Sequence, residues 1–358
     1  MSTKFSGLDI TDRQMKKSLF HNLDEVTLMR AILAVLIVFM HSFTCYNHSW
    51  PPPESFVEIP LYQWLSRISF AFALEAFVFV SGYLFSFSYY MLKKNDTFLS
   101  FCWKKIKRLI IPSIIFSMVY FFLFYQYSGV DVLIYRILNG CGHMWFLPML
   151  FWCSIAGWII IRINLNDVCK LFLLAFLSMV VPDILPFRIG TAAIFMFYFY
   201  GGVVAYKYID KVNAFVTKRR LIIGWVIFAI VFVVMRPLRD ELCSSGSPSS
   251  LINVVSLIGG RACRLIYASC GTMVFWSTAV YFVHHNQLSS RATHFSSLCF
   301  GIYLFQQFIL QLLYYRTCFP KLLGPYWLPW FGFVVTMLFS YIAADLVKKT
   351  RFGREIIG

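Results

Sequence analysis

Charged residues are scarce in this sequence of 358 residues. Only 13% are Asp, Glu, Lys or Arg, about half the share found in soluble globular domains, and 59% are hydrophobic. An apolar secretory signal is also missing, since residues 1–25 are polar and carry several basic side chains. These two absences exclude an ordinary soluble domain. They indicate an integral membrane protein whose first span acts as its own insertion signal.

The motifs of several enzyme and metal-binding classes are missing too. The ten cysteines contain no CxxC pair and lie mostly within apolar segments, so no metal site is predicted. No glycine-rich phosphate loop and no serine-nucleophile elbow occurs. Cys45, Cys141, Cys243 and Cys318 fall near one predicted face of the membrane, which leaves a disulfide among them open.

Apolar runs long enough to cross a bilayer, which takes about 20 residues, recur along the whole chain. We predict about ten spans, at 28–46, 67–91, 109–127, 144–162, 168–182, 188–206, 221–236, 262–283, 296–315 and 327–347. Because 251–283 is too long for one simple helix and contains Gly259-Gly260, we expect a surface turn or re-entrant piece before the eighth span. The predicted fold class is all-α, with one transmembrane domain over 28–347 between a cytoplasmic segment 1–27 and a basic cytoplasmic tail 348–358.

Basic residues are distributed unevenly between alternate loops. The loops on the side of the amino terminus carry 22 Lys and Arg, and the loops on the opposite side carry seven. Because positive residues concentrate in cytoplasmic loops, we expect both termini in the cytoplasm. The same clustering in short runs between spans accounts for the net charge of +16 without nucleic acid as a partner.

An arginine and a histidine, Arg30 and His41, stand inside the otherwise apolar first span. On a helix, eleven steps of about 100° bring both side chains within about 20° of one face, roughly 16 Å apart along the axis. Such groups face a protein interior or a wet cavity and mark a site. Since imidazole is a common base and guanidinium binds phosphate, the pair suggests a base and a phosphate clamp on one wall of a tunnel. The alternatives are an Arg30 that reaches lipid headgroups and a His41 that only bonds another helix.

Further candidates lie in the second and fourth spans. Glu75, at a depth near that of His41, orients or charges the imidazole, or else pairs with an arginine. Ser81, followed by glycine, by itself indicates close helix packing. His143 and Trp145 begin the fourth span on the outer side, where His143 can approach His41, or where both serve as ordinary interface residues.

Two arginines at the outer end of the eighth span, Arg261 and Arg264, are three residues apart and share a helical face. They are candidates for holding a phosphorylated or anionic acceptor, or for simple anchoring at the interface. On the cytoplasmic side, the strongest anchors are the basic runs at 104–108 and 218–220.

In their order and placement, these residues resemble the membrane-bound acyltransferase 3 family, which includes bacterial O-acetyltransferases of surface polysaccharides. The most specific match is Arg30, ten residues, then His41. The other matches are Glu75, Phe77, Ser81 and Gly82; Lys105, Arg108 and Pro112; His143, Trp145, Phe146 and Leu147; Tyr198 to Gly202; and Gly301, Ile302, Tyr303 and Leu304. The resemblance covers about residues 25–347.

The ninth span departs from the family pattern. After Leu304 the family often has a histidine within two residues, whereas this chain continues Phe305-Gln306-Gln307. The departure argues against a second catalytic histidine in this span.

The resemblance implies transfer of an acyl group, usually acetyl, from cytoplasmic acyl-CoA to a hydroxyl of a surface glycan or its lipid-linked precursor. It also implies a bacterial inner membrane as the location. The implied catalytic residues are His41 as general base, Glu75, Ser81 and His143; the donor-binding residues are Arg30, Lys105 and Arg108; the acceptor-binding residues are Trp145, Arg261 and Arg264.

Two other functions fit the same composition, namely a transporter or flippase for a glycan or small solute, and a catalytically inactive membrane sensor. If the protein is an enzyme, the acyl group can pass directly to the acceptor or first form a covalent intermediate on His41, and the sequence does not decide between these two mechanisms. The acyl group, the acceptor sugar and the oligomeric state are also open.

Overall fold

A computed structural model describes residues 23–53, 56–91, 97–125, 129–244 and 250–357. The described residues are 86% helical and contain no strand. Nine helical stretches among them are long and apolar enough to cross a membrane. The predicted class, an all-α polytopic membrane protein, is therefore confirmed. Residues 1–22 of the predicted cytoplasmic segment 1–27 lie outside the described residues.

The nine stretches are α2 (Asp24–Ser42); α3 and α4 (Pro60–Ser69, Ala73–Tyr90); α5, the π-helical turn η2 and α6 (Phe98–Lys105, Ile106–Ile110, Ile111–Phe124); η3 and α8 (Gly142–Trp145, Phe146–Ile160); η4 and α10 (Pro186–Arg188, Ile189–Lys207); α12 (Lys218–Ser244); α13 (Ser250–His285); α14 (Ser290–Tyr315); and α15 (Phe319–Lys349). The shorter elements are η1 (Thr44–Asn47), α7 (Val130–Asn139), α9 (Asp167–Val180), α11 (Ile209–Phe215) and α16 (Arg351–Ile357). The predicted span 168–182 corresponds to α9, whose 14 residues rise about 21 Å, less than the roughly 30 Å of a bilayer core.

The prediction of a surface turn or re-entrant piece before the eighth span is wrong, because α13 continues as one helix of 36 residues through Gly259 and Gly260. These glycines serve the packing of α13 against α12 instead. A Cβ on Gly260 would lie 2.8 Å from Sγ of Cys243, and one on Gly259 would lie 3.1 Å from a methyl carbon of Leu242. Small residues that let two backbones approach are a common means of helix association in membranes.

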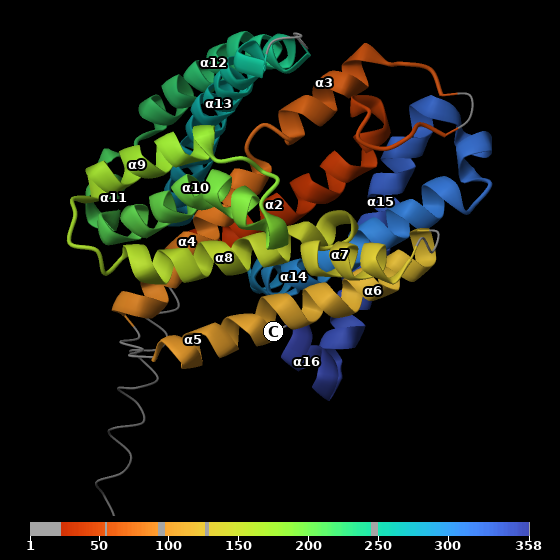
Figure 1. Cartoon of the computed structure of the whole chain (residues 1–358), viewed down its shortest axis with the longest axis horizontal. Coiled ribbons are helices and arrows are strands. Elements are labelled where there is room, and N and C mark those ends of the chain that lie inside the picture. Colours follow the sequence, from red (N-terminus) through yellow and green to blue (C-terminus); the bar gives the residue numbers. More distant parts are fainter. Residues whose placement is uncertain (1–22, 54–55, 92–96, 126–128, 245–249, 358) are drawn as a thin grey trace, which may run out of the picture.

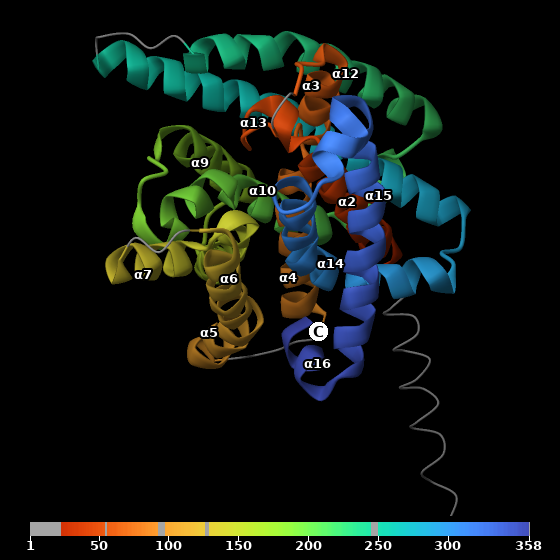
Figure 2. The ribbon, with the colours of Figure 1, turned by 90° about the vertical axis from the view of Figure 1, so that its right-hand side faces the viewer.

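Helices α4 and α10 lie in the middle of the bundle, and the α12–α13 hairpin runs along one side of it (Figures 1 and 2). Helices α5 and α16 lie on the side away from that hairpin. Helix α14 packs against both α2 and α15. The basic tail forms α16, which folds back beside the end of α15 and the π-helical turn η2.

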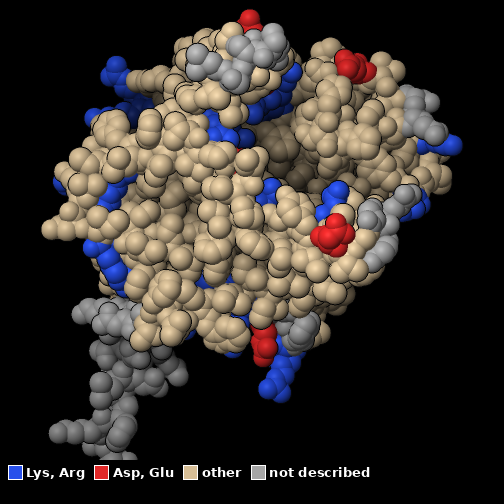
Figure 3. All heavy atoms as spheres, viewed as in Figure 1, with Lys and Arg blue, Asp and Glu red and all other residues tan. Residues whose placement is uncertain are grey.

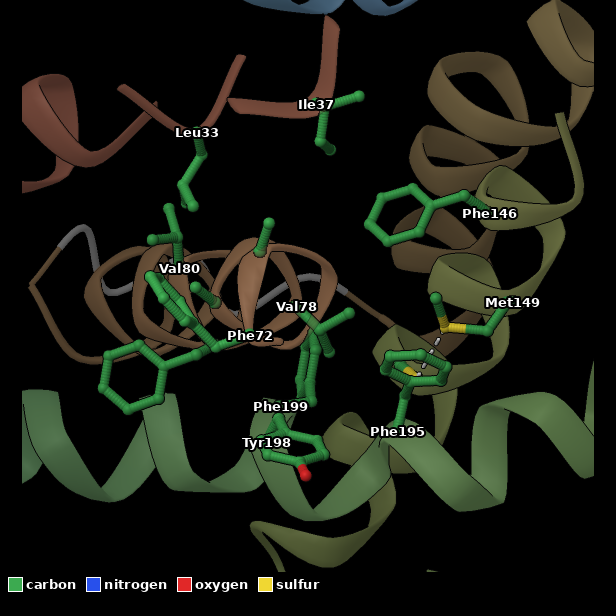
Figure 4. Packing of buried hydrophobic residues seen from close by; sticks show 14 of the residues in the cluster. Leu33, Ile37, Phe72, Val78, Val80, Phe146, Met149, Phe195, Tyr198 and Phe199 are labelled. Carbon is green, nitrogen blue, oxygen red and sulfur yellow. Dashed lines mark hydrogen bonds between the residues drawn. The ribbon is translucent and has the colours of Figure 1, made fainter. Parts of the chain in front are cut away.

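The core of the bundle depends on a very close contact between α4 and α10. A Cβ on Gly82 would lie 1.8 Å from the backbone oxygen of Phe199, and one on Gly202 would lie 2.0 Å from that of Phe79. Figure 4 shows side chains of α2, α4, α8 and α10 that meet around this contact. Since the obstacle at each glycine is backbone, neither site has room for a side chain without moving a helix.

All ten cysteines are described, and all are free. The disulfide left open by the sequence therefore does not form among the four outer cysteines in this structure.

Gly202→Ala should destabilise the protein by about 1–3 kcal/mol, because the added methyl overpacks the α4–α10 contact. The neighbouring variant Gly201→Ala is a matched control, since its Cβ would meet only the Phe79 ring, at an ordinary 3.7 Å. Thermal unfolding of both variants in lipid nanodiscs measures the difference. Equal melting temperatures for the two variants would contradict this account of the packing.

Candidate active site

Two imidazoles lie beside each other where α2 ends and η3 begins. The ring centroids of His41 and His143 are 6.5 Å apart, and the rings are inclined by 65°. Trp50 stacks on His41 at 6.2 Å, and Tyr303 packs against His143 at 5.1 Å. The sequence-based expectation that His143 approaches His41 is therefore met by the fold. His143 is buried, whereas His41 remains partly accessible.

His41 is oriented by a buried amide of α14. Its Nδ1 lies 3.1 Å from Oε1 of Gln306, and an amide oxygen can only accept a hydrogen bond. The proton of the neutral ring therefore belongs on Nδ1, which leaves the lone pair on Nε2. The amide nitrogen of Gln306 is buried without a hydrogen-bond partner among the described residues. His41 is thus the imidazole that can accept a proton from another molecule.

His143 is held in a different way, by the next residue of α14. The backbone N–H of His143 donates to Oε1 of Gln307 at 2.6 Å, and its ring Nδ1 contacts the same oxygen. Its Nε2 lies 3.2 Å from the carbonyl oxygen of Leu304. Both ring nitrogens of His143 face oxygen atoms of the protein, so neither is open to a substrate.

A glycine allows His143 to reach this position. Gly142 has a φ of +54°, a conformation that residues with a side chain rarely adopt. A Cβ on Gly142 would also lie 2.7 Å from the Tyr120 ring and 2.9 Å from Oε1 of Gln307. The first position of η3 therefore needs glycine, both for its backbone angle and for the space that Gln307 occupies.

Glu75 contacts Arg264 in the structure, and not His41. Its Oε1 accepts from Nε of Arg264 at 2.8 Å, and NH2 of Arg264 lies 2.7 Å from the same oxygen. The carboxylate is almost fully buried, so the pair joins α4 to α13 within the bundle. Of the two alternatives that the sequence left open, the geometry matches the arginine pair. The orienting contact expected from Glu75 is made by Gln306.

A cavity of about 360 Å³ lies between α2, α4, α8 and α14 and the α5–η2 segment. Its basic lining comes from Arg30, Lys104, Lys105 and Arg108. Lys105 directly precedes the π-helical turn η2, and Arg108 lies within it. A π-helical turn is a local widening of the helix that often occurs at functional sites. Four cations around one cavity suit a ligand that carries several phosphates.

The rest of the cavity is largely apolar and extends toward the imidazoles. Its lining includes Ile37, one helical turn before His41, and Tyr303, whose hydroxyl donates to the backbone oxygen of His143 at 2.5 Å. Neither imidazole belongs to the lining. Ser81 also lines the cavity, and its hydroxyl donates to the Phe77 carbonyl of its own helix at 2.9 Å.

The contacts of the remaining predicted residues are with groups other than the imidazoles. The Trp145 ring contacts Phe195, at 6.2 Å, and the guanidinium of Arg188, at 6.0 Å. Arg261 donates to the carbonyl oxygens of Met179 and Val181, at the end of α9. Arg261 therefore caps a neighbouring helix and does not face the same partner as Arg264.

A comparison with known protein families identifies the family of this chain. A model of the acyltransferase 3 family, described as an acyltransferase domain, matches residues 23–347. The chain belongs to this acyltransferase family. Neither the curated proteins nor the solved structures include a match. In this integral membrane acyltransferase, the family model thus covers all nine of the apolar helical stretches among the described residues, almost to the end of α15.

Sequence reasoning missed Gln306, Gln307 and Trp50 as parts of the site. For the glutamines a signal exists in the sequence, because they replace the histidine often found in the family at this point of the ninth span. Their partners could not be identified, since His41 and Gln306 are separated by 265 positions along the chain. Trp50 carries no sequence signal that separates it from an ordinary interface tryptophan.

Gln306→Leu should lower kcat of this acyltransferase about 10- to 100-fold, because His41 loses the acceptor that fixes its Nδ1–H, and base catalysis contributes about 10²–10⁴-fold. KM for the acyl donor should stay unchanged, and Gln306→Glu should restore much of the rate. Steady-state kinetics with the labelled donor measures both. Gln311→Leu, on the same helix and partly exposed, is the control. An unaltered kcat in Gln306→Leu would remove Gln306 from the role of positioning residue.

Proposed function

We propose that this protein is a membrane O-acyltransferase that moves an acetyl group from cytoplasmic acetyl-CoA to a hydroxyl of a surface glycan or its lipid-linked precursor. The observation that carries the proposal is the contact of Nδ1 of His41 with Gln306, one helical turn beyond Ile37, which lines a cavity that also contains four basic side chains. We place the protein in a bacterial inner membrane with both termini in the cytoplasm. The excess of basic residues in one set of loops supports that orientation.

The donor enters from the basic part of the cavity. Arg30, Lys105 and Arg108 bind the phosphates of CoA, since guanidinium and ammonium groups make charge-assisted hydrogen bonds to phosphate oxygens. The apolar part of the cavity takes the pantetheine arm. Its course past Ile37 and Tyr303 brings the thioester toward the imidazoles. The acceptor approaches His41 from the side of Trp50.

Transfer takes place in one displacement at the thioester carbonyl. Nε2 of His41 takes the proton of the acceptor hydroxyl while the hydroxyl oxygen bonds to the carbonyl carbon. The tetrahedral intermediate then expels the sulfur of CoA, and His41 returns the proton to that thiolate. Gln306 keeps Nδ1–H in place throughout. The products are an ester and free CoA.

The oxyanion of the tetrahedral intermediate needs hydrogen-bond donors. Ser81 is one candidate donor because it lines the cavity, and its hydroxyl would exchange its bond to the Phe77 carbonyl for one to the intermediate. The buried amide nitrogen of Gln306 is a second candidate donor, since it has no partner among the described residues. His143 and Trp145 shape the acceptor end, and Glu75 acts through its pair with Arg264.

His41→Ala should reduce acyl transfer at least 100-fold in protein that folds normally, because it removes the base. The assay follows label from acetyl-CoA into a lipid extract of the host, with His285→Ala, at the far end of α13, as a control. Undiminished labelling in His41→Ala would remove this residue as the base. Label that stays on denatured wild-type protein in the absence of acceptor would contradict direct transfer and support acyl-His41.

Arg108→Gln should weaken acetyl-CoA binding about 10-fold or more, because hydrogen bonds to charged groups contribute about 1.5–3 kcal/mol. Lys107→Gln is the matched control. Lys107 lies in the same π-helical turn, but its ammonium packs over the Trp103 ring and it does not line the cavity. Calorimetric titration of acetyl-CoA into protein in nanodiscs gives both affinities. Equal losses in the two variants would show a general effect of surface charge and contradict a specific phosphate site.

A further inference from the structure

Three arginines surround a single aspartate where α12 approaches its carboxyl end. Asp240 lies 3.2 Å from Nε of Arg236 and 3.7 Å from NH1 of Arg239, both on α12. NH2 of Arg67, on α3, lies 3.6 Å from the same carboxylate. We call Arg67, Arg236 and Arg239 the outer arginine cluster, because the predicted orientation places it on the side of the membrane away from the cytoplasm.

The outer arginine cluster carries more positive charge than its aspartate can balance. Each guanidinium offers five N–H donors, whereas one carboxylate accepts about four hydrogen bonds. The three side chains are 16–33% exposed, so water screens their mutual repulsion only in part. Such an arrangement is stabilised when a second anion joins Asp240.

The other arginines that the predicted orientation places on this side contact different groups. Arg264 pairs with the buried carboxylate of Glu75. Backbone carbonyl oxygens accept from Arg188, Arg261 and Arg316, and Arg136 lies over the Tyr125 ring. The outer arginine cluster differs from these because three guanidinium groups share one carboxylate.

The cluster belongs to helices that border a hollow in the surface. Figure 3 shows this hollow with Lys and Arg on its walls, and in the same view Figure 1 shows α3 and the α12–α13 hairpin around it, with α2 behind. His41 is near the carboxyl end of α2. Soon after α2, Nδ2 of Asn47 donates to Oγ of Ser66 at 2.8 Å, next to Arg67 in the chain. The cluster thus lies on the same side as the end of α2 that carries the proposed base.

This position separates the outer arginine cluster from the donor site. The basic residues that line the donor cavity come from the start of α2 and from α5 and η2, whereas the cluster comes from α3 and the end of α12. An anion at the cluster would therefore belong to a molecule other than the CoA that the cavity holds.

We propose that the acceptor is anionic, and that a carboxylate or phosphate on its sugar or lipid carrier binds the outer arginine cluster. This inference rests on the proposed function and names the chemical class of its acceptor. The guanidinium of Arg67 lies over the Trp64 ring at 5.6 Å, which limits its orientation, and its five N–H groups outnumber its one contact with Asp240. Bidentate recognition by such a group favours planar carboxylates and phosphates over neutral hydroxyls.

A matched pair of probes tests the charge directly. Octyl glucuronide and octyl glucoside share the alkyl chain and the sugar ring and differ by one carboxylate. Binding of each, below its micelle concentration, is measured by calorimetry with the protein in phosphatidylcholine nanodiscs. We expect at least 10-fold tighter binding of the glucuronide. Equal affinities for the two probes would overturn the proposal.

Variants tie the preference to the cluster. The double variant Arg67→Gln, Arg239→Gln should lose the preference for the glucuronide, whereas Arg219→Gln, exposed at the other end of α12, should keep it. Asp240→Asn should strengthen glucuronide binding, since it removes the competing carboxylate. A double variant that retains the full preference would overturn the proposal, and so would weaker binding in a folded Asp240→Asn protein.

Anionic lipid and the host's own glycolipids provide two further measurements. If the cluster binds lipid headgroups instead of an acceptor, nanodiscs with 30% phosphatidylglycerol will abolish the preference for the glucuronide, and that result would overturn the proposal. Labelled acyl transfer to the anionic and neutral glycolipid fractions of the host tests the function separately. A charge preference that depends on the cluster, without transfer to either fraction, would support the anion site and refute the proposed O-acyltransferase reaction.

Discussion

The hydrogen bonds between two adjacent glutamines of α14 and two imidazoles organise the centre of this molecule. Residues i and i+1 of a helix point about 100° apart, so Gln306 and Gln307 reach two different neighbours. Inside a bilayer each polar group must find its partner within the protein. The amide of Gln306 leaves His41 with a free lone pair, whereas Gln307 and a backbone carbonyl engage both nitrogens of His143. One dipeptide thus gives the two imidazoles different surroundings.

Two groups of cations lie at separate places in this acyltransferase. One set of cations, from α2 and the α5–η2 segment, lines a largely apolar cavity. The other set surrounds Asp240 near the end of α12. A reaction that joins a donor from one side of a membrane to an acceptor from the other needs two such binding regions that meet at the chemical groups. The buried pair of Glu75 and Arg264 joins α4 to α13 beside this path.

The partner of Glu75 shows why depth in the membrane does not identify a contact. From the sequence, its carboxylate can orient or charge His41 or pair with an arginine, and both alternatives satisfy a buried charge equally well. The direction of the side chain follows from helix rotation and packing, which hydropathy does not contain. Similarly, the sequence Gly259-Gly260 is compatible with a turn or with a close contact between helices. In the structure both glycines lie within α13 and pack against α12.

Composition, span length and the 3.6-residue helical period were sufficient for the all-α class, for most of the spans and for the shared face of Arg30 and His41, because these properties are local. The order of motifs was sufficient for the family. The contacts of His41 with Gln306, of Glu75 with Arg264 and of Arg67 with Asp240 join residues 173 or more positions apart. Such contacts depend on which helices become neighbours and how each is rotated. They follow from the packing of the whole bundle, which no local pattern specifies.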